Sequence, residues 1–138
     1  FLIGDVDRIF MYKHHFPTPK NNQLHAVEVD VEDGVIILNS GLLAQSVLER
    51  SQFYNIAIHA YAEAIFSTKG KLQNIEGSSG LEIVSGWKNE DILKQTGLVE
   101  IDDAILHTHH FFTFRQAYKK IYPENYAKFM MYFNIPEE

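Results

Sequence analysis

The sequence predicts an α+β fold, in which a small mixed sheet is formed first and helices follow. Strand-like segments gather near the N-terminus, and helical periodicity dominates the remainder of the chain. Such a separation of strands from helices is typical of the α+β class. The chain has 138 residues, of which 46% are hydrophobic, so it can bury one good core. We therefore expect a single domain over residues 1–138.

Three N-terminal segments have the patterns of strands. Residues 6–12 are rich in β-branched and aromatic side chains, and residues 24–31 alternate between two faces. Residues 35–38 (Val-Ile-Ile-Leu) form a short apolar run, which favours a central strand. The proline-containing segment 13–23 and the acidic turn 32–34 predict the connections between these strands.

The first predicted helix follows the last strand directly. Ser40 is a candidate N-cap for a helix over residues 41–50, because its hydroxyl can accept from the orphan N–H groups of the first turn. The inward face of this helix is predicted to consist of four aliphatic side chains: Leu42, Leu43, Val47 and Leu48. A second helix is predicted over residues 52–66.

The middle of the chain contains most of its glycines. Residues 67–86 predict a surface loop with one short strand at 81–84. Residues 87–97 predict a short helix, which Gly97 would end.

The C-terminal third predicts helices only. A long helix is expected from Asp102 to about Lys120, continuous or restarted, since an acidic residue at its start complements the helix dipole. Pro123 is expected to open the last helix in its first turn, and Pro136 to end it.

Composition and charge exclude several classes of function. The net charge is −6 and Lys119-Lys120 is the only adjacent basic pair, so we expect no nucleic-acid partner. The chain contains no cysteine, which excludes disulfides, thiolate zinc sites and cysteine nucleophiles. Any metal must therefore be held by His, Asp or Glu. No apolar run approaches the length of a membrane span, so we expect no membrane segment in this chain.

The most informative stretch is the helix predicted over residues 52–66. His59 and Glu63 are four residues apart, so they lie side by side on a helix and both could reach one ligand. This spacing is that of a helical zinc motif, in which two ligands flank a catalytic Glu. Here Ala60 follows the histidine, and a Glu occupies the second ligand position. An ordinary hydrogen-bonded His–Glu pair is the alternative interpretation.

Five segments occur in an order that points to a known family. A strand ending in Ile-Phe-Met-Tyr precedes residues 34–40 (Gly-Val-Ile-Ile-Leu-Asn-Ser) and residues 55–63 (Asn-Ile-Ala-Ile-His-Ala-Tyr-Ala-Glu). His-His-Phe-Phe at 109–112 and Tyr-Pro-Glu-Asn-Tyr at 122–126 follow. In this order the chain resembles the Mlc titration factor A (MtfA-like) family of zinc-dependent peptidases. The resemblance covers nearly the whole chain, but lacks the family's N-terminal helical portion.

The resemblance implies a zincin-like metallopeptidase fold and a set of metal ligands. His59 matches the family's first zinc ligand, and Glu63 falls on its second histidine ligand. Ala60 falls where the family has its general-base Glu. Asp102 falls on the third, carboxylate ligand, and His109 on a family Glu seven residues later. The candidate ligands for zinc or another divalent metal are thus His59, Glu63, Asp102 and His109.

The departures from the family pattern bear on function. Loss of a general base costs about 10²–10⁴-fold in rate, and one imidazole with two carboxylates suits Mn, Mg or Ca better than zinc. We therefore expect no catalysis and no obligatory cofactor, and hypothesise a binding or regulatory module for a protein or peptide partner. The resemblance implies a bacterial, cytoplasmic protein. The alternatives are an active zinc-dependent peptidase or other metallohydrolase with a non-standard site, and an unrelated structural domain that shares the motif order.

Overall fold

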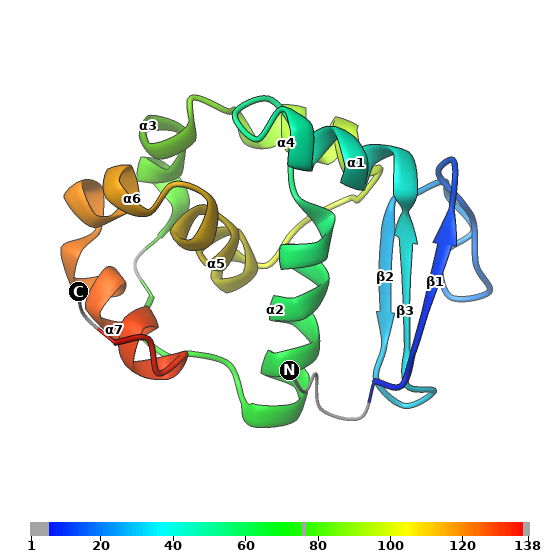
Figure 1. Ribbon diagram of the computed structural model, residues 1–138, viewed down its shortest axis with the longest axis horizontal. Coiled ribbons are helices and arrows are strands. Elements are labelled where there is room, and N and C mark those ends of the chain that lie inside the picture. The colour runs from blue at the N-terminus through cyan, green and yellow to red at the C-terminus, as the bar shows by residue number, and fades with distance from the viewer. Residues whose placement is uncertain (1–5, 76, 137–138) are drawn as a thin grey trace.

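The protein has an α+β architecture with the sheet at one end of the molecule (Figure 1). The computed structural model describes residues 6–75 and 77–136; residues 1–5, Glu76 and residues 137–138, which the predicted domain includes, lie outside the described residues. The strands are β1 (Arg8–Tyr12), β2 (Val27–Asp30) and β3 (Val35–Asn39). The α-helices are α1 (Ser40–Leu48), α2 (Ile56–Lys69), α3 (Leu81–Ser85), α4 (Asn89–Thr96), α5 (Asp103–Thr113), α6 (Arg115–Ile121) and α7 (Pro123–Tyr132).

The sheet is mixed, and β3 is its central strand, as the apolar run predicts. The strand order is β1-β3-β2. β1 runs parallel to β3, with Arg8 opposite Val35 and Tyr12 opposite Asn39. β2 runs antiparallel to β3, with Val27 opposite Leu38. Both β1 and β2 are therefore edge strands within the described part of the chain.

α2 stands between the sheet and the C-terminal helices (Figure 1). It packs against β2 on one side and against α5 on the other. The buried hydrophobic side chains of the sheet, α2, α5, α6 and α7 form one cluster, which includes Ile36, Leu38 and Ala60. α5 is buried around most of its circumference, since nine of its residues are buried. α2 therefore carries the predicted site residues into the junction between the sheet and the helices.

Two boundaries near the N-terminus differ from the predictions. β2 is shorter than the predicted strand over 24–31, and His25 instead forms an isolated bridge with Phe16. The N-cap of α1 is Asn39, whose Oδ1 accepts from the Leu42 N–H at 3.0 Å, and the prediction of Ser40 was wrong by one residue.

The predicted inward stripe of α1 is only partly correct. Val47 and Leu48 are 69% and 83% exposed, whereas Leu42 and Ser46 are buried. These two buried residues are four apart, so one narrow side of the short helix faces the protein and its C-terminal end does not.

The later helices show two further differences and settle one open alternative. α2 begins at Ile56, because Asn55 Oδ1 accepts from the N–H groups of the next turn. The predicted strand at 81–84 is wrong: this segment is helix α3, which buries residues three apart, Leu81 and Val84. The helix predicted from Asp102 to about Lys120, continuous or restarted, is of the restarted kind, and it breaks at Phe114 between α5 and α6.

Two turn predictions are confirmed. Gly97 ends α4 with a φ of 73°, and a Cβ there would collide with the Leu24 carbonyl oxygen. Glycine thus lets the end of α4 pass close to the chain leading into β2, where the Ala26 N–H donates to the Thr96 carbonyl oxygen at 2.8 Å. Pro123 is the first residue of α7. None of the helices in the described part combines the length and apolarity needed to cross a bilayer.

Candidate functional site

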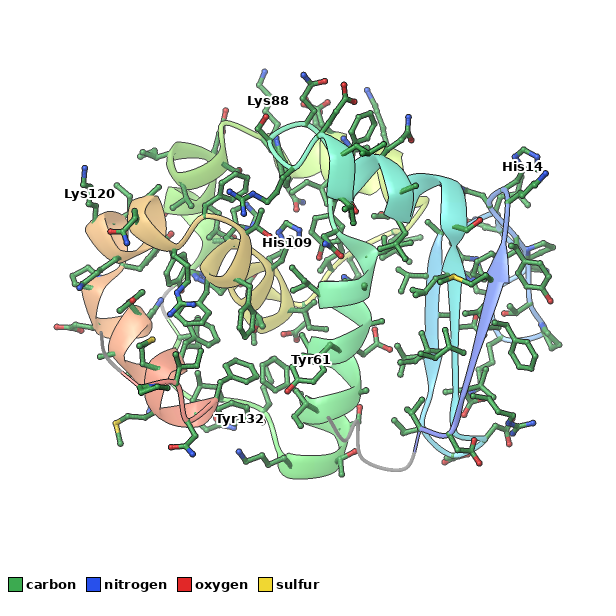
Figure 2. The ribbon with its side chains drawn as sticks, in the orientation of Figure 1. His14, Tyr61, Lys88, His109, Lys120 and Tyr132 are labelled. Atoms are coloured by element: carbon green, nitrogen blue, oxygen red, sulfur yellow. The ribbon has the colours of Figure 1, made fainter. Side chains whose placement is uncertain are left out.

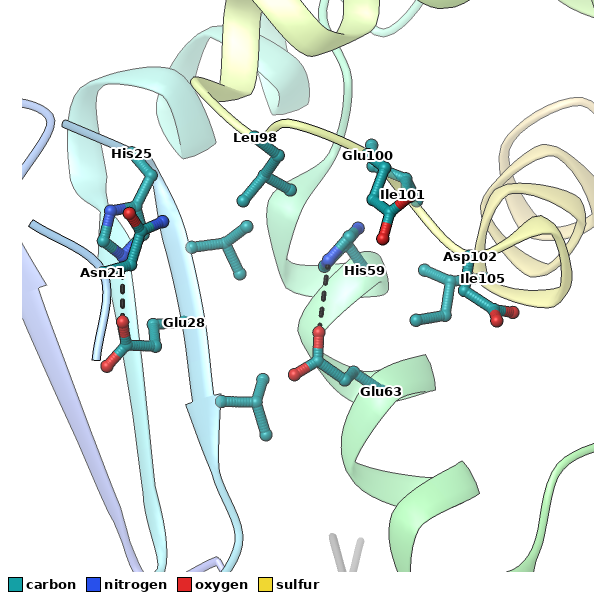
Figure 3. A pocket seen from close by; sticks show the side chains of 12 residues that line it. Asn21, His25, Glu28, His59, Glu63, Leu98, Glu100, Ile101, Asp102 and Ile105 are labelled. Carbon is teal, nitrogen blue, oxygen red and sulfur yellow. Dashed lines mark hydrogen bonds and ion pairs between the residues drawn. The ribbon is translucent and has the colours of Figure 1, made fainter. Parts of the chain in front are cut away.

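A cleft of about 360 Å³ lies between β2 and α2 (Figure 3). The loop between α4 and α5 closes part of it. Its walls combine aliphatic side chains with carboxylates and two histidines. The lining residues are Asn21, His25, Val27, Glu28, Val29, His59, Glu63, Leu98, Glu100, Ile101, Asp102 and Ile105.

The β2 wall includes the outer edge of the strand. Val27, Glu28 and Val29 all line the cleft although successive side chains point to opposite faces of a sheet. Lining by consecutive residues therefore places the unpaired edge of β2 in the cleft. His25 Nε2 lies 3.0 Å from Glu28 Oε1 (Figure 3). Thr18 Oγ1 donates to the same carboxylate oxygen. These contacts hold Glu28 in one position.

The α2 wall carries His59 and Glu63 side by side, as their spacing predicts. His59 Nε2 lies 3.5 Å from Glu63 Oε1, and both residues face the cleft (Figure 3). His59 is buried and Glu63 is partly exposed. The helix therefore presents an imidazole from below the surface and a carboxylate at the mouth.

Tyr54 contacts His59 from beneath the cleft. Its hydroxyl oxygen lies 2.8 Å from His59 Nδ1. Burial raises the pKa of Tyr54 well above its usual value of 10, and the Glu63 carboxylate acts in the same direction. The hydroxyl thus keeps its proton at neutral pH, and its hydrogen bond to Nδ1 holds the imidazole ring in place with Nε2 toward Glu63.

Ala60 faces the core and not the cleft. It is 1% exposed and belongs to the buried hydrophobic cluster. The position that resembles the family's general base therefore has neither an acceptor atom nor access to the cleft in this structure.

Asp102 lines the cleft, but its carboxylate has other partners. Oδ1 accepts from the Ala104 N–H at 2.9 Å and caps α5, and Oδ2 lies 2.7 Å from Lys71 Nζ. Partial desolvation acts to raise the pKa of Asp102, but the Lys71 and Ala104 contacts outweigh it and lower the pKa below its usual value. Asp102 is thus an ionised helix cap within an ion pair.

His109 lies in the interior between α5 and α2 (Figure 2). Its Nε2 accepts from the Asn55 N–H at 2.9 Å, and its ring stacks on Tyr54 with centroids 4.1 Å apart. Burial lowers the pKa of His109 well below 6.5, and neighbouring His110 and His59 lower it further. A neutral His109 therefore supports the start of α2.

The structure brings together only part of the predicted metal set. His59 and Glu63 are adjacent, whereas Asp102 is bound to Lys71 and His109 to the backbone of Asn55. Within residues 6–75 and 77–136, no group of three or more His, Cys, Asp or Glu side chains is arranged to hold a metal ion.

Sequence patterns did not indicate Tyr54 or the His25–Glu28 pair as parts of the site. Tyr54 is five residues before His59, which is not a spacing that predicts contact on a helix, and it precedes the helix. Glu28 belongs to an acidic run that is typical of a solvated strand, and only the tertiary structure turns it toward His25.

Comparisons of the chain with models of protein families, with curated proteins and with solved structures found no match. The resemblance to the MtfA-like family therefore depends on the order of motifs in the sequence. Membership in that family stays a prediction.

The histidines of α5 predict a loss of stability in acid. His110 is buried, its Nδ1 donates to the Leu106 carbonyl oxygen, and its Nε2 accepts from Ser85 Oγ at 3.0 Å. Burial lowers the pKa of His110 to about 4. In the unfolded chain His110 therefore becomes protonated near pH 6.5, whereas in the folded chain it becomes protonated only near pH 4.

Stability linked to His110 is fully present above pH 6.5 and is lost as the pH falls toward 4, by up to about 3 kcal/mol. Urea unfolding at a series of pH values measures this slope. His110→Gln should reduce the slope between these pH values, and His109 should account for part of the remainder. A His110 resonance that titrates near 6.5 in NMR would contradict the expectation.

Proposed function

We propose that this chain is a binding module with a zincin-like, catalytically degenerate metallopeptidase fold. Its ligand is an extended basic segment of a peptide or protein, which lies along β2 in the cleft and is not hydrolysed. A regulatory role through such a partner follows from binding without turnover. The observation that carries the proposal is the cleft itself, which joins an unpaired strand edge to the His59–Glu63 pair.

The arrangement around α2 supports the zincin-like part of the proposal. A helix with a His and an acidic residue one turn apart lies beside an antiparallel edge strand, with a cleft between them. The order of motifs in the sequence supports the same assignment. The function of the cleft is argued from its own chemistry.

Two observations favour binding over hydrolysis. Ala60 supplies no proton acceptor and is buried away from the cleft. Asp102 is held in an ion pair with Lys71 and caps α5. The alternative, a metallohydrolase with a non-standard site, would require Asp102 to leave Lys71.

The lining of the cleft indicates the chemistry of the ligand. Its lining contains four carboxylates and no Lys or Arg, and five aliphatic side chains lie beside them. Asp102 is paired with Lys71 and Glu28 is held by His25 and Thr18, which leaves Glu63 and Glu100 to meet a basic ligand. An unpaired strand edge offers main-chain hydrogen bonds to an extended segment, while side-chain pockets supply specificity. A segment in which basic and aliphatic residues alternate matches all three features.

Binding of a short peptide that alternates Lys and Val tests the proposal by fluorescence anisotropy. We expect saturable binding that weakens with added salt, and little binding of a peptide that alternates Glu and Val. Glu63→Gln and Glu100→Gln should each weaken binding about fivefold, the equivalent of about 1 kcal/mol for an exposed charge pair. Glu49→Gln, an exposed substitution outside the cleft, should have no effect. Chelator-sensitive cleavage of the peptide would contradict the proposal.

A further inference from the structure

β1 exposes an unusual amount of apolar surface for a strand. All five residues of the strand are exposed. The exposed fraction is between 46% and 54% for its four large apolar side chains, which are Ile9, Phe10, Met11 and Tyr12. By contrast, Ile36 and Leu38 of the neighbouring β3 are buried. Large apolar side chains gathered on one exposed element mark an interaction surface.

β1 is also an edge strand with few of the features that protect edges. It pairs with β3 along one side, and the sheet ends there, on the side of the molecule opposite the C-terminal helices (Figure 1). Its five residues, Arg-Ile-Phe-Met-Tyr, contain no proline, no glycine and one charge at the end. An unprotected apolar edge of this kind is a template for pairing with another chain.

We propose that β1 pairs antiparallel with β1 of a second copy, so that two sheets join into one. A two-fold axis at Phe10 would place Phe10 against its own copy and Ile9 against Met11 of the second copy. In this register all five residues of the strand are paired, and the same surface is used twice, as two-fold symmetry requires.

Charge complementarity supports this register. The residue before β1 is Asp7 and the residue after it is Lys13, so each Asp7 lies opposite Lys13 of the second copy. Each Arg8 lies opposite Tyr12 of the second copy, but its guanidinium donates to the Asp33 carbonyl oxygen of its own protomer at 2.6 Å. If the two-fold axis were at Met11 instead, Ile9 would lie opposite Lys13 and both Asp7–Lys13 pairs would be lost. The flanking charges therefore select the fully paired register.

Competing contacts of Asp7 and Lys13 are weak. Asp7 lies 3.3 Å from Arg8 Nε in an ion pair whose side chains are 74% and 57% exposed. Exposed pairs of this kind contribute about 0–1 kcal/mol. Lys13 makes no ion pair in the described residues. The two residues are thus available for a partner.

The dimer is expected to be weak, because one strand pair forms an interface at the small end of the known range. Sedimentation velocity over a wide range of protein concentrations should show a reversible shift from monomer to dimer. Phe10→Lys places two ammonium groups together at the axis and should abolish the shift. Leu48→Lys, at another exposed apolar residue, should leave it unchanged.

Charge reversal at the two flanking residues identifies the register. Asp7→Lys and Lys13→Asp should each weaken self-association about tenfold, since each converts two attractive cross-strand pairs into two repulsive ones. Mixing the two single variants should produce a heterodimer, in which both pairs are attractive again. The combined variant Asp7→Lys/Lys13→Asp should associate as the wild type does. Circular dichroism checks that each variant is folded.

Three results would overturn the proposal. They are a monomer at every concentration, a dimer that survives Phe10→Lys, and a mixture of single variants that associates no better than either alone. The first would mean that another molecule or segment covers β1, the second that the dimer uses a different surface, and the third that the register is wrong.

Discussion

Ala60→Glu is expected to lower the free energy of unfolding by about 4 kcal/mol, because it places a carboxylate in a hydrophobic core without a partner. Ala60 is 1% exposed and packs within the buried cluster that joins α2 to the sheet and to the C-terminal helices. Urea unfolding at neutral pH measures the loss. The combined change Ala60→Glu/Glu63→His, which would reproduce the zinc motif of the MtfA-like family, should carry the same cost and should not produce hydrolysis.

Ala57→Glu is the matched control for this substitution. It introduces the same side chain in the same helix, but at a partly exposed position in the first turn, where acidic residues are favourable. Its effect should stay within about 0.5 kcal/mol.

In Ala60→Glu, burial of the new carboxyl raises the pKa of that carboxyl. This variant should therefore recover stability as the pH falls through that pKa. A well-folded Ala60→Glu protein with zinc-dependent peptidase activity would contradict the placement of Ala60 in the core.

Phe111→Ala should lower the free energy of unfolding by about 3–5 kcal/mol, the range for a buried Phe replaced by Ala. Phe111 is fully buried, and its ring stacks on Phe129 with centroids 5.1 Å apart. It also lies against Tyr118 and Tyr126 and under the Arg115 guanidinium. No single neighbour can move to fill the space of a side chain with contacts on so many helices.

Phe112→Ala provides the comparison, since Phe112 is the adjacent residue of α5 and is only half-buried. Its ring contacts Phe133 at 5.0 Å, at the edge of the same aromatic cluster. We expect it to cost less than half as much as Phe111→Ala in urea unfolding. Equal losses for the two variants would show that α5 does not bury Phe111 more deeply than Phe112.

Local sequence patterns predicted most of the fold. The apolar run at 35–38 indicated the central strand, and Gly97 and Pro123 indicated the end of α4 and the start of α7. The segment at 81–84 was predicted incorrectly, because a short apolar segment has no periodicity that separates a strand from a helix. The packing of Leu81 and Val84 against the core decides between them, and that packing is tertiary.

The site was predictable where it depends on one helix. His59 and Glu63 are adjacent because the α-helix places residues four apart on one side. Asp102 and His109 were assigned by resemblance alone, and their actual partners, Lys71 and Asn55, lie 31 and 54 residues away in the chain. No local spacing encodes such contacts.

The central claim is that the cleft between β2 and α2 binds an extended basic segment without hydrolysing it. An NMR titration of the backbone amides with the alternating Lys and Val peptide tests this most directly. We expect the shifts to concentrate at β2, at His59 and Glu63, and in the loop that carries Glu100, while the peptide stays intact with zinc present. Shifts confined to α6 and α7, or the appearance of peptide fragments, would contradict it.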